Sequence, residues 1–205
     1  MTPHTHEQLK AIKQSFRSMM NGPAAASMRE RGTAYKLNWG VALPLLRQMA
    51  AEYGRDYDLA IALWKENIRE CKILATMIMP PDRLLPEVAD IWMEQTPTQE
   101  LAEIAASCLY QYLPYASVMA YEWMATDKPY YQIAAYTILG RLFARQMEPN
   151  EMGINEFLDQ AAVALRDPNM GVRHAAYNCL GRFEQLGDEF AHLAHSAMRS
   201  QGIDY

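Results

Sequence analysis

An internal repeat near the end of the chain restricts the possible folds more than any other feature. Residues 134–141 read AAYTILGR and residues 175–182 read AAYNCLGR, so six of eight positions are identical at an offset of 41. Residues 165–180, LRDPNMGVRHAAYNCL, have the form of a HEAT repeat, with an Asp-Pro turn before a Val-Arg pair. Self-similarity at this spacing is typical of stacked helical repeats. The sequence therefore predicts an all-α fold, an α-solenoid of HEAT-like helical pairs. An ordinary helical bundle with chance similarity is the alternative.

Helix-forming residues fill the whole chain, and prolines mark most of the breaks between helices. Ala, Leu, Met, Glu, Gln and Arg dominate, and no run alternates polar and apolar residues as a strand does. A capping box from Thr5 to Gln8 is predicted to begin the first helix. The predicted helices cover residues 6–20, 24–31, 44–53, 57–65, 68–79, 83–94, 98–112, 115–125, 129–146, 152–166, 170–186 and 188–200. Because no long polar linker separates them, we expect residues 1–205 to form a single domain.

The composition argues against several classes of protein. Half of the residues are apolar, so the chain can bury a large core. The net charge is −5, so charge alone does not hold the protein on nucleic acid or on a membrane. The sequence has no long apolar run and no apolar signal core at the N-terminus, which predicts a cytoplasmic protein without membrane attachment. Cys71, Cys108 and Cys179 are expected to be three buried thiols.

Nothing in the sequence predicts a cofactor or a metal site. It has no Gly-rich phosphate loop, no nucleophile elbow and no Cys/His zinc pattern. His192 and His195 lie one turn apart in a predicted helix, but no third ligand follows at metal-binding spacing. We therefore expect no cofactor, no metal, and a solvent-facing pair of histidines.

Two stretches in the first half of the chain carry a distinctive pattern. Residues 62–75, ALWKENIRECKILA, place a Trp at the end of one helix and an Arg-Glu pair at the start of the next. Residues 35–41, YKLNWGV, are followed by Pro44 and Arg47. This pattern resembles the DNA alkylation repair family typified by AlkD, over about residues 5–190. The resemblance implies a HEAT-like solenoid, whose active members are DNA glycosylases. They excise positively charged alkylated bases and hold the duplex on a basic concave face.

The same resemblance implies one catalytic carboxylate. The family has a motif similar to Trp-Asp-x-x-Asp, which corresponds here to residues 98–103, TQELAE. Glu103 takes the position of the carboxylate that stabilises the cationic sugar as the base leaves. Gln99 replaces the tryptophan, Asn178 falls near a second aromatic of the base-binding cradle, and Gln132 falls near a phosphate-gripping arginine. The motif is degenerate, so we expect lost or weak glycosylase activity. The alternative for Glu103 is an exposed helix glutamate without a role.

Basic and acidic residues are distributed unevenly along the chain. Residues 1–79 carry 11 Lys/Arg against 7 Asp/Glu, a balance of +4, whereas residues 80–205 carry 8 against 17, a balance of −9. Acidic surfaces repel phosphate, so the sequence predicts weak, salt-sensitive binding of duplex DNA. The candidate DNA-binding residues are Arg69, Lys72, Arg141, Arg145, Arg173 and Arg182. Arg141 and Arg182 end the two repeated blocks and are expected to project from the same side. For Arg173, pairing with the nearby Asp167 is the alternative.

Seven tyrosines are concentrated between residues 110 and 136, in a region poor in basic residues. They are Tyr110, Tyr112, Tyr115, Tyr121, Tyr130, Tyr131 and Tyr136. Aromatic clusters of this kind favour a protein-binding surface over stacking on bases. Two functions therefore compete. The first is a DNA-damage-associated binder with little or no glycosylase activity, and the alternative is a non-catalytic scaffold that binds a protein through a tyrosine-rich concave face.

Overall fold

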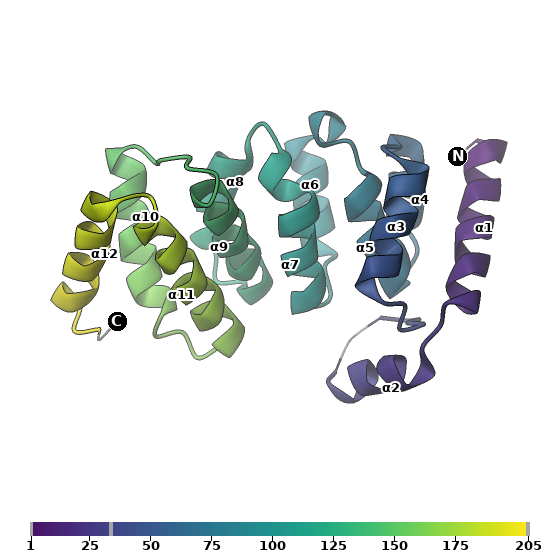
Figure 1. The fold of residues 1–205 in the computed structure, drawn as a ribbon, viewed down its shortest axis with the longest axis horizontal. Helices are drawn as coiled ribbons and strands as arrows, with labels where there is room; N and C mark the ends of the chain where they lie inside the picture. The colour runs from purple at the N-terminus through teal and green to yellow at the C-terminus, as the bar shows by residue number, and fades with distance from the viewer. Residues whose placement is uncertain (1, 33–34, 204–205) are drawn as a thin grey trace. The chain divides into compact units, whose positions relative to one another are not determined.

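The structure is a computed structural model that describes residues 2–32 and 35–203, and over these residues it is helical throughout (Figure 1). The chain divides into two compact units, Met1–Leu109 and Tyr110–Tyr205. The helices of the first unit are α1 (Pro3–Ser18), α2 (Gly22–Glu30), α3 (Leu43–Tyr53), α4 (Tyr57–Trp64), α5 (Arg69–Ile78), the 3-10 helix η1 (Pro81–Arg83), α6 (Pro86–Glu94) and α7 (Gln99–Cys108). Those of the second are the 3-10 helix η2 (Tyr110–Tyr112), α8 (Ala116–Met124), α9 (Pro129–Phe143), α10 (Glu151–Ala164), α11 (Met170–Glu184) and α12 (Asp188–Ser200).

The all-α prediction is confirmed over the described residues, which contain no strand and one isolated parallel bridge, between Leu37 and Ile68. None of the described helices has the length and apolar character needed to cross a membrane. The prediction of one domain stays a prediction, because the helices gather into two compact units.

Four predicted helix boundaries are wrong by three or more residues: the starts at 6 and 83, observed at Pro3 and Pro86, and the ends at 112 and 146, observed at Cys108 and Phe143. Two of them have clear local reasons. The first helix begins earlier than the predicted capping box, because the side chain of Thr2 accepts the backbone N–H of Thr5 and Pro3 occupies the first turn. The helix predicted over residues 98–112 ends at Cys108, because Leu109 leaves the helical conformation with φ −130° and ψ −64°. The 3-10 helix η2 follows it.

In the first unit α5 packs against more helices than its neighbours do. α5 lies against α3, α4 and α7, while α1 packs on α4. The indole of Trp64, at the end of α4, stacks on that of Trp92 in α6 with ring centroids 4.1 Å apart. The indole N–H of Trp64 also donates to Oε1 of Gln95 at the end of α6, 2.8 Å away. The tryptophan of the distinctive sequence block therefore joins two successive helical pairs.

In the second unit the repeated sequence blocks occupy equivalent helices. α9 and α11 have the same length of 15 residues, and their first and last residues are related by the 41-residue offset of the repeat. The two helices pack directly on each other. Gly140 lies at this contact, where a Cβ atom would be 3.6 Å from Cα of Cys179, an ordinary van der Waals distance. On the other side of the unit α10 packs on α12, and Tyr121 of α8 hydrogen-bonds to Gly153 of α10.

Candidate nucleic-acid interface

A buried network of charged groups holds the start of α5. The guanidinium of Arg69 makes two parallel hydrogen bonds with the carboxylate of Glu100, at 2.6 and 2.8 Å, and a third contact with Glu70 at 3.3 Å. Glu70 is completely buried and accepts the backbone N–H groups of Trp39 and Val41. Burial alone would lower the pKa of Arg69, but the two carboxylates raise it above its ordinary value. The Arg-Glu pair of the sequence block thus anchors an adjoining loop to α5 and α7.

A second contact ties the same loop to α7. The hydroxyl groups of Tyr35 and Thr98 are hydrogen-bonded at 2.8 Å, and Thr98 also caps α7 by accepting the backbone N–H of Leu101. Burial raises the pKa of Tyr35 to about 12, so its phenol stays protonated at neutral pH. The stretch that resembles the family's early turn is therefore a packing element of this unit.

Lys72, one helical turn after Arg69, is also directed into the protein. Its ammonium lies 4.2 Å from the ring centroid of Trp64 and donates to the carbonyl oxygen of the same residue. Both Arg69 and Lys72 are buried, and each is bonded within the first unit. A DNA phosphate has no access to them in this arrangement, so we leave both residues out of the proposed DNA contacts.

The position of the family's catalytic carboxylate holds a hydrogen-bonded pair. Glu103 and Gln99 lie one turn apart on α7, both half-buried, and the amide of Gln99 donates to Oε1 of Glu103 at 2.7 Å. Where the resemblance calls for an indole that could cradle a cation, this chain has an amide that occupies the carboxylate. The pair therefore offers no aromatic face on which a cationic base could stack.

The two other residues aligned with the family's site lie in the second unit and also bond locally. Asn178 is exposed on α11 and its amide lies 3.4 Å from Nε2 of His174. Gln132 donates to the carbonyl oxygen of Thr126, so it closes the turn before α9. Neither side chain offers an aromatic face or a positive charge.

The four candidate arginines of the second unit differ in what they bind. Arg145 donates to the carbonyl oxygen of Gln111 at 2.7 Å. Arg173 donates to the carbonyl oxygen of Asp167 at 2.6 Å, which is a backbone version of the pairing considered from the sequence. Arg141 and Arg182 are exposed on the adjacent helices α9 and α11. Arg141 has no hydrogen bond or ion pair to any described residue, whereas Arg182 bonds only to Gln185 on its own helix.

The seven tyrosines of the tyrosine-rich region do not all lie at the surface. Tyr110 and Tyr136 are in the core, and Tyr110 contacts Trp123 edge-to-face with ring centroids 5.2 Å apart. Tyr136 makes a similar contact with Phe157. Tyr112 and Tyr130 are exposed, and the remaining three are partly buried. Tertiary packing therefore uses much of the aromatic area that the sequence suggested for binding a protein.

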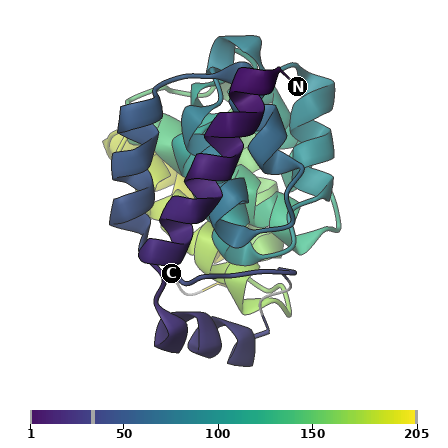
Figure 2. The same cartoon turned by 90° about the vertical axis from the view of Figure 1, so that its right-hand side faces the viewer.

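The first unit has a basic edge that the sequence analysis did not single out. Arg17, at the end of α1, and Arg29, Arg31 and Lys36, within or after α2, are exposed, against one acidic residue in this stretch, Glu30. In both views α2 lies at the edge of its unit, below the ends of α1 and α3 (Figures 1 and 2). We call these four residues the α2 basic edge. A charge count over a shorter window would have found it, because the count over residues 1–79 averages it with the acids that follow.

The histidine pair at the end of the second unit, His192 and His195, lies at the surface of α12. His195 lies 3.1 Å from the carboxylate of Glu184, and His192 is exposed on the same helix. Among residues 2–32 and 35–203, no group of three His, Cys, Asp or Glu side chains is arranged to hold a metal ion.

Comparison with known proteins places these features in a family. A solved structure from a family of proteins related to the HEAT-like repeat DNA glycosylases, with affinity for branched DNA structures, has a TM-score of 0.80 to this one. The two chains share 15% sequence identity over 95% of this chain and 92% of that one, so the likeness establishes the fold and confirms the HEAT-like solenoid. No curated protein sequence matches the chain. The family model described as DNA alkylation repair enzyme matches residues 12–185, so the chain belongs to the DNA alkylation repair enzyme family.

Proposed function

We propose that this protein binds DNA, with a preference for branched structures, and has lost effective DNA glycosylase activity. The single observation that carries the proposal is the hydrogen bond between Gln99 and Glu103, in a chain of the DNA alkylation repair enzyme family. The chain keeps the family's fold, but it lacks the aromatic group that the resemblance requires beside the catalytic carboxylate.

The loss of activity follows from the chemistry of a cationic base. An aromatic face contributes roughly 0.5–2 kcal/mol to binding a cation, and two such faces are replaced here, by Gln99 and Asn178. Glu103 is one methylene longer than the aspartate of the family motif, and a misplacement of about 1 Å can reduce a rate on the order of a hundredfold. These changes together remove several powers of ten from the expected rate of base release.

Basic surface that can contact phosphate remains in each unit. The α2 basic edge offers four exposed cations in the first unit, and the exposed pair Arg141 and Arg182 lies on neighbouring helices in the second. Such side chains bind phosphate through charge and release counterions, without reading sequence. The structural relative has affinity for branched DNA structures, which supports the same class of ligand for this chain.

The alternative, a protein-binding scaffold that uses the tyrosine-rich region, is weakened by the burial of two of the seven tyrosines. It needs the tyrosines on one surface, and Tyr110 and Tyr136 are buried. We therefore do not favour it as the main function.

Two measurements test the proposal. In the first, wild type and Glu103→Gln are incubated with duplex DNA that carries a cationic methylated purine, and release of the free base is followed. We expect release at background in both proteins. Release well above background that Glu103→Gln abolishes would show that Glu103 is catalytic and overturn the loss of activity.

In the second measurement, wild type is titrated with a four-way DNA junction and with a linear duplex of the same total length, at several salt concentrations. We expect tighter binding of the junction, with affinity for both falling as salt rises. Failure to bind either DNA at low salt would overturn the DNA-binding part of the proposal. Equal affinity for the two would overturn the preference for branched structures.

A further inference from the structure

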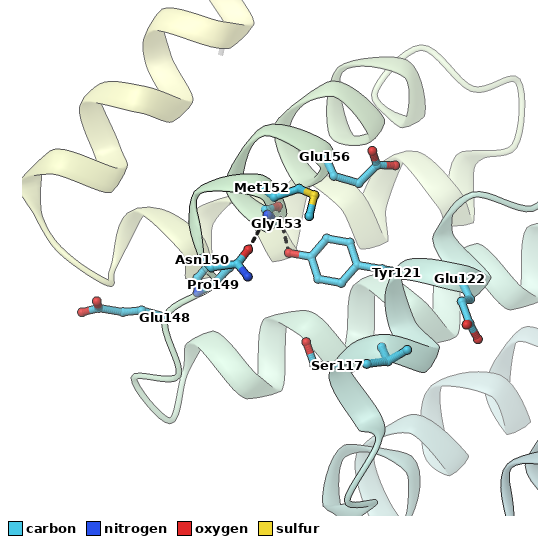
Figure 3. A pocket seen from close by; sticks show the side chains of 10 residues that line it. Ser117, Tyr121, Glu122, Glu148, Pro149, Asn150, Met152, Gly153 and Glu156 are labelled. Carbon is cyan, nitrogen blue, oxygen red and sulfur yellow. Dashed lines mark hydrogen bonds between the residues drawn. The ribbon is translucent and has the colours of Figure 1, made fainter.

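The second unit has a surface pocket of about 510 Å³ between α8 and the beginning of α10 (Figure 3). Its lining includes three apolar or aromatic residues and three acidic ones: Val118, Tyr121, Met152, Glu122, Glu148 and Glu156. It lies on the α8–α10 side of the unit, whereas the exposed Arg141 and Arg182 belong to α9 and α11. None of its lining residues belongs to the proposed DNA contacts, so the pocket calls for a separate explanation.

A specific contact builds the floor of the pocket. The hydroxyl of Tyr121 donates to the carbonyl oxygen of Gly153, 2.9 Å away and 32 residues later in the chain. Burial raises the pKa of Tyr121 well above its ordinary value, so the phenol remains a donor at neutral pH. A Cβ atom on Gly153 would lie only 3.0 Å from this hydroxyl oxygen, so the glycine makes room for the bond. The ring of Tyr121 is thereby fixed between the two helices, as Figure 3 shows.

Apolar side chains beside this ring are exposed to solvent. Val118 is 62% exposed and Met152 is 75% exposed, although both line the pocket. Exposed apolar area next to a concavity is typical of a surface that another molecule covers. Methionine is also a common residue of adaptable binding surfaces, because its side chain is flexible and polarisable.

All the charged residues that line the pocket are acidic. Glu122, Glu148 and Glu156 line the pocket. In Figure 3 Glu148 lies on the hydroxyl side of the Tyr121 ring, beyond Pro149 and Asn150, and Glu122 lies on the opposite side. None of the three forms an ion pair with any residue that the structure describes. Neither α8 nor residues 146–165 contain a Lys, Arg or His. An anionic backbone such as DNA is repelled here, whereas a cation is attracted.

We infer that this pocket binds a basic and apolar segment of a partner protein. In this complex an apolar side chain covers Val118 and Met152, and flanking Lys or Arg side chains reach the glutamates that line the pocket. The long stems of Lys and Arg suit such a surface, because they cover apolar area while their charged ends stay near carboxylates. The inference does not rest on the proposed DNA binding, since the two use different residues.

The test uses the full chain and two fluorescent hexapeptides of known sequence. One peptide has two leucines flanked by lysines, and the other has the same leucines flanked by glutamates. Binding is followed by fluorescence anisotropy at low salt. We expect the lysine peptide to bind at least about tenfold more tightly than the glutamate peptide. Equal affinity for both peptides would overturn the inference.

Matched variants separate this pocket from general attraction to an acidic protein. The triple variant Glu122→Gln/Glu148→Gln/Glu156→Gln should weaken binding of the lysine peptide about tenfold. The control Asp127→Asn/Asp159→Asn/Glu189→Gln removes the same charge from exposed positions of the same unit outside the pocket lining, and should change affinity less than about twofold. An equal loss in both variants would contradict a specific site.

Two further readouts decide what occupies the pocket. Met152→Ser should weaken the lysine peptide while keeping all charges, because it removes apolar contact; unchanged affinity would contradict the apolar part of the inference. Sedimentation of the protein alone distinguishes a partner from a second copy. We expect a monomer, and self-association abolished by the glutamine triple variant would show that the basic segment belongs to another copy of this chain.

Discussion

In α5 of the first unit the guanidinium of Arg69 is buried between two carboxylates, whereas in α9 and α11 of the second unit Arg141 and Arg182 are exposed to solvent. All three arginines lie on helices that pack against neighbouring pairs, and all three were candidates for DNA binding. The difference lies in their neighbours. Arg69 is followed directly by Glu70 and meets Glu100 from α7, while Arg141 and Arg182 each follow a glycine at the end of a repeated block.

Whether a basic residue in a helical repeat is buried or available to a ligand therefore depends on its acidic neighbours. A buried guanidinium is stable only where carboxylates and carbonyl groups satisfy it, and Arg69 has both. Arg141 and Arg182 have no carboxylate partner among the described residues and keep their charge at the surface. The first arrangement stabilises the unit, and the second leaves charge available to a ligand.

The largest expected effect is that of replacing the buried arginine. Arg69→Met leaves the carboxylate of Glu70 buried without its cation and releases Glu100, which should lower the free energy of unfolding by about 3–5 kcal/mol. Urea unfolding followed by circular dichroism measures the change.

The matched control for this prediction is Arg141→Met, which replaces a solvent-exposed arginine. It should change stability by less than about 0.5 kcal/mol, since the side chain has no described partner. If Arg69→Met costs as little as the control, the buried network is not a stabilising element, and the two regions do not differ as we conclude.

The next effect concerns DNA binding by the exposed arginines of the second unit. Arg141→Ala/Arg182→Ala should weaken binding of a four-way junction by roughly tenfold at low salt, because two phosphate contacts are removed. The slope of log affinity against log salt should become shallower by about 1.8, since each phosphate contact contributes about 0.9. Fluorescence anisotropy at four salt concentrations gives both values.

A charge-matched control tests whether position matters in this experiment. Lys65→Ala/Arg199→Ala removes two exposed cations that lie outside the proposed contacts. It should leave the slope nearly unchanged. The same loss of slope in both double variants would mean that DNA affinity depends only on the net charge of the protein. Arg141 on α9 and Arg182 on α11 would then not be specific phosphate contacts.

Arg145 is intermediate between Arg69 and Arg141, because it is exposed but hydrogen-bonded. Its guanidinium donates to the carbonyl oxygen of Gln111 and lies 5.3 Å from the ring centroid of Tyr112, so it fastens η2 to the end of α9. Arg145→Met should lower the free energy of unfolding by about 1 kcal/mol. A thermal or urea melt beside Arg141→Met measures the difference, and equal stability of the two variants would rule out this structural role.

The repeat made much of the fold predictable from the sequence. The blocks at residues 134–141 and 175–182 lie at equivalent positions of α9 and α11, and Pro44 and Pro129 lie in the first turns of α3 and α9 as expected. Local signals failed where a backbone conformation decided the boundary. Leu109, for example, ends α7 through dihedral angles that its side chain does not encode.

The candidate site was harder to predict, because burial and pairing depend on residues distant in sequence. Glu100 lies 31 residues after Arg69, and nothing in the local sequence shows that their side chains meet. The pocket of Tyr121 likewise depends on Gly153, in another helix. The pairing of Glu103 with Gln99 could have been predicted from the sequence, since residues four apart on a helix are neighbours.

The last expected effect is a pH dependence that marks Lys72 as an interior residue. Burial lowers its pKa to about 8, from an ordinary value of 10.5. Between these two values the unfolded chain binds more protons at this lysine than the folded protein does. Stability contributed by this group therefore rises with pH over that interval and is constant below it. Buried Cys179 and Tyr136 act in the opposite direction, because burial raises their pKa values and the unfolded chain loses those protons first.

Comparing wild type with Lys72→Met removes these opposing contributions, since both proteins share them. The free energy of unfolding is measured in urea at pH 7, 8, 9 and 10. We expect the difference, wild type minus variant, to stay constant up to about pH 8 and to increase toward pH 10. An exposed lysine with its ordinary pKa gives no such increase. A flat difference across the whole range would therefore place the ammonium of Lys72 in solvent, and would return this residue to the set available for DNA.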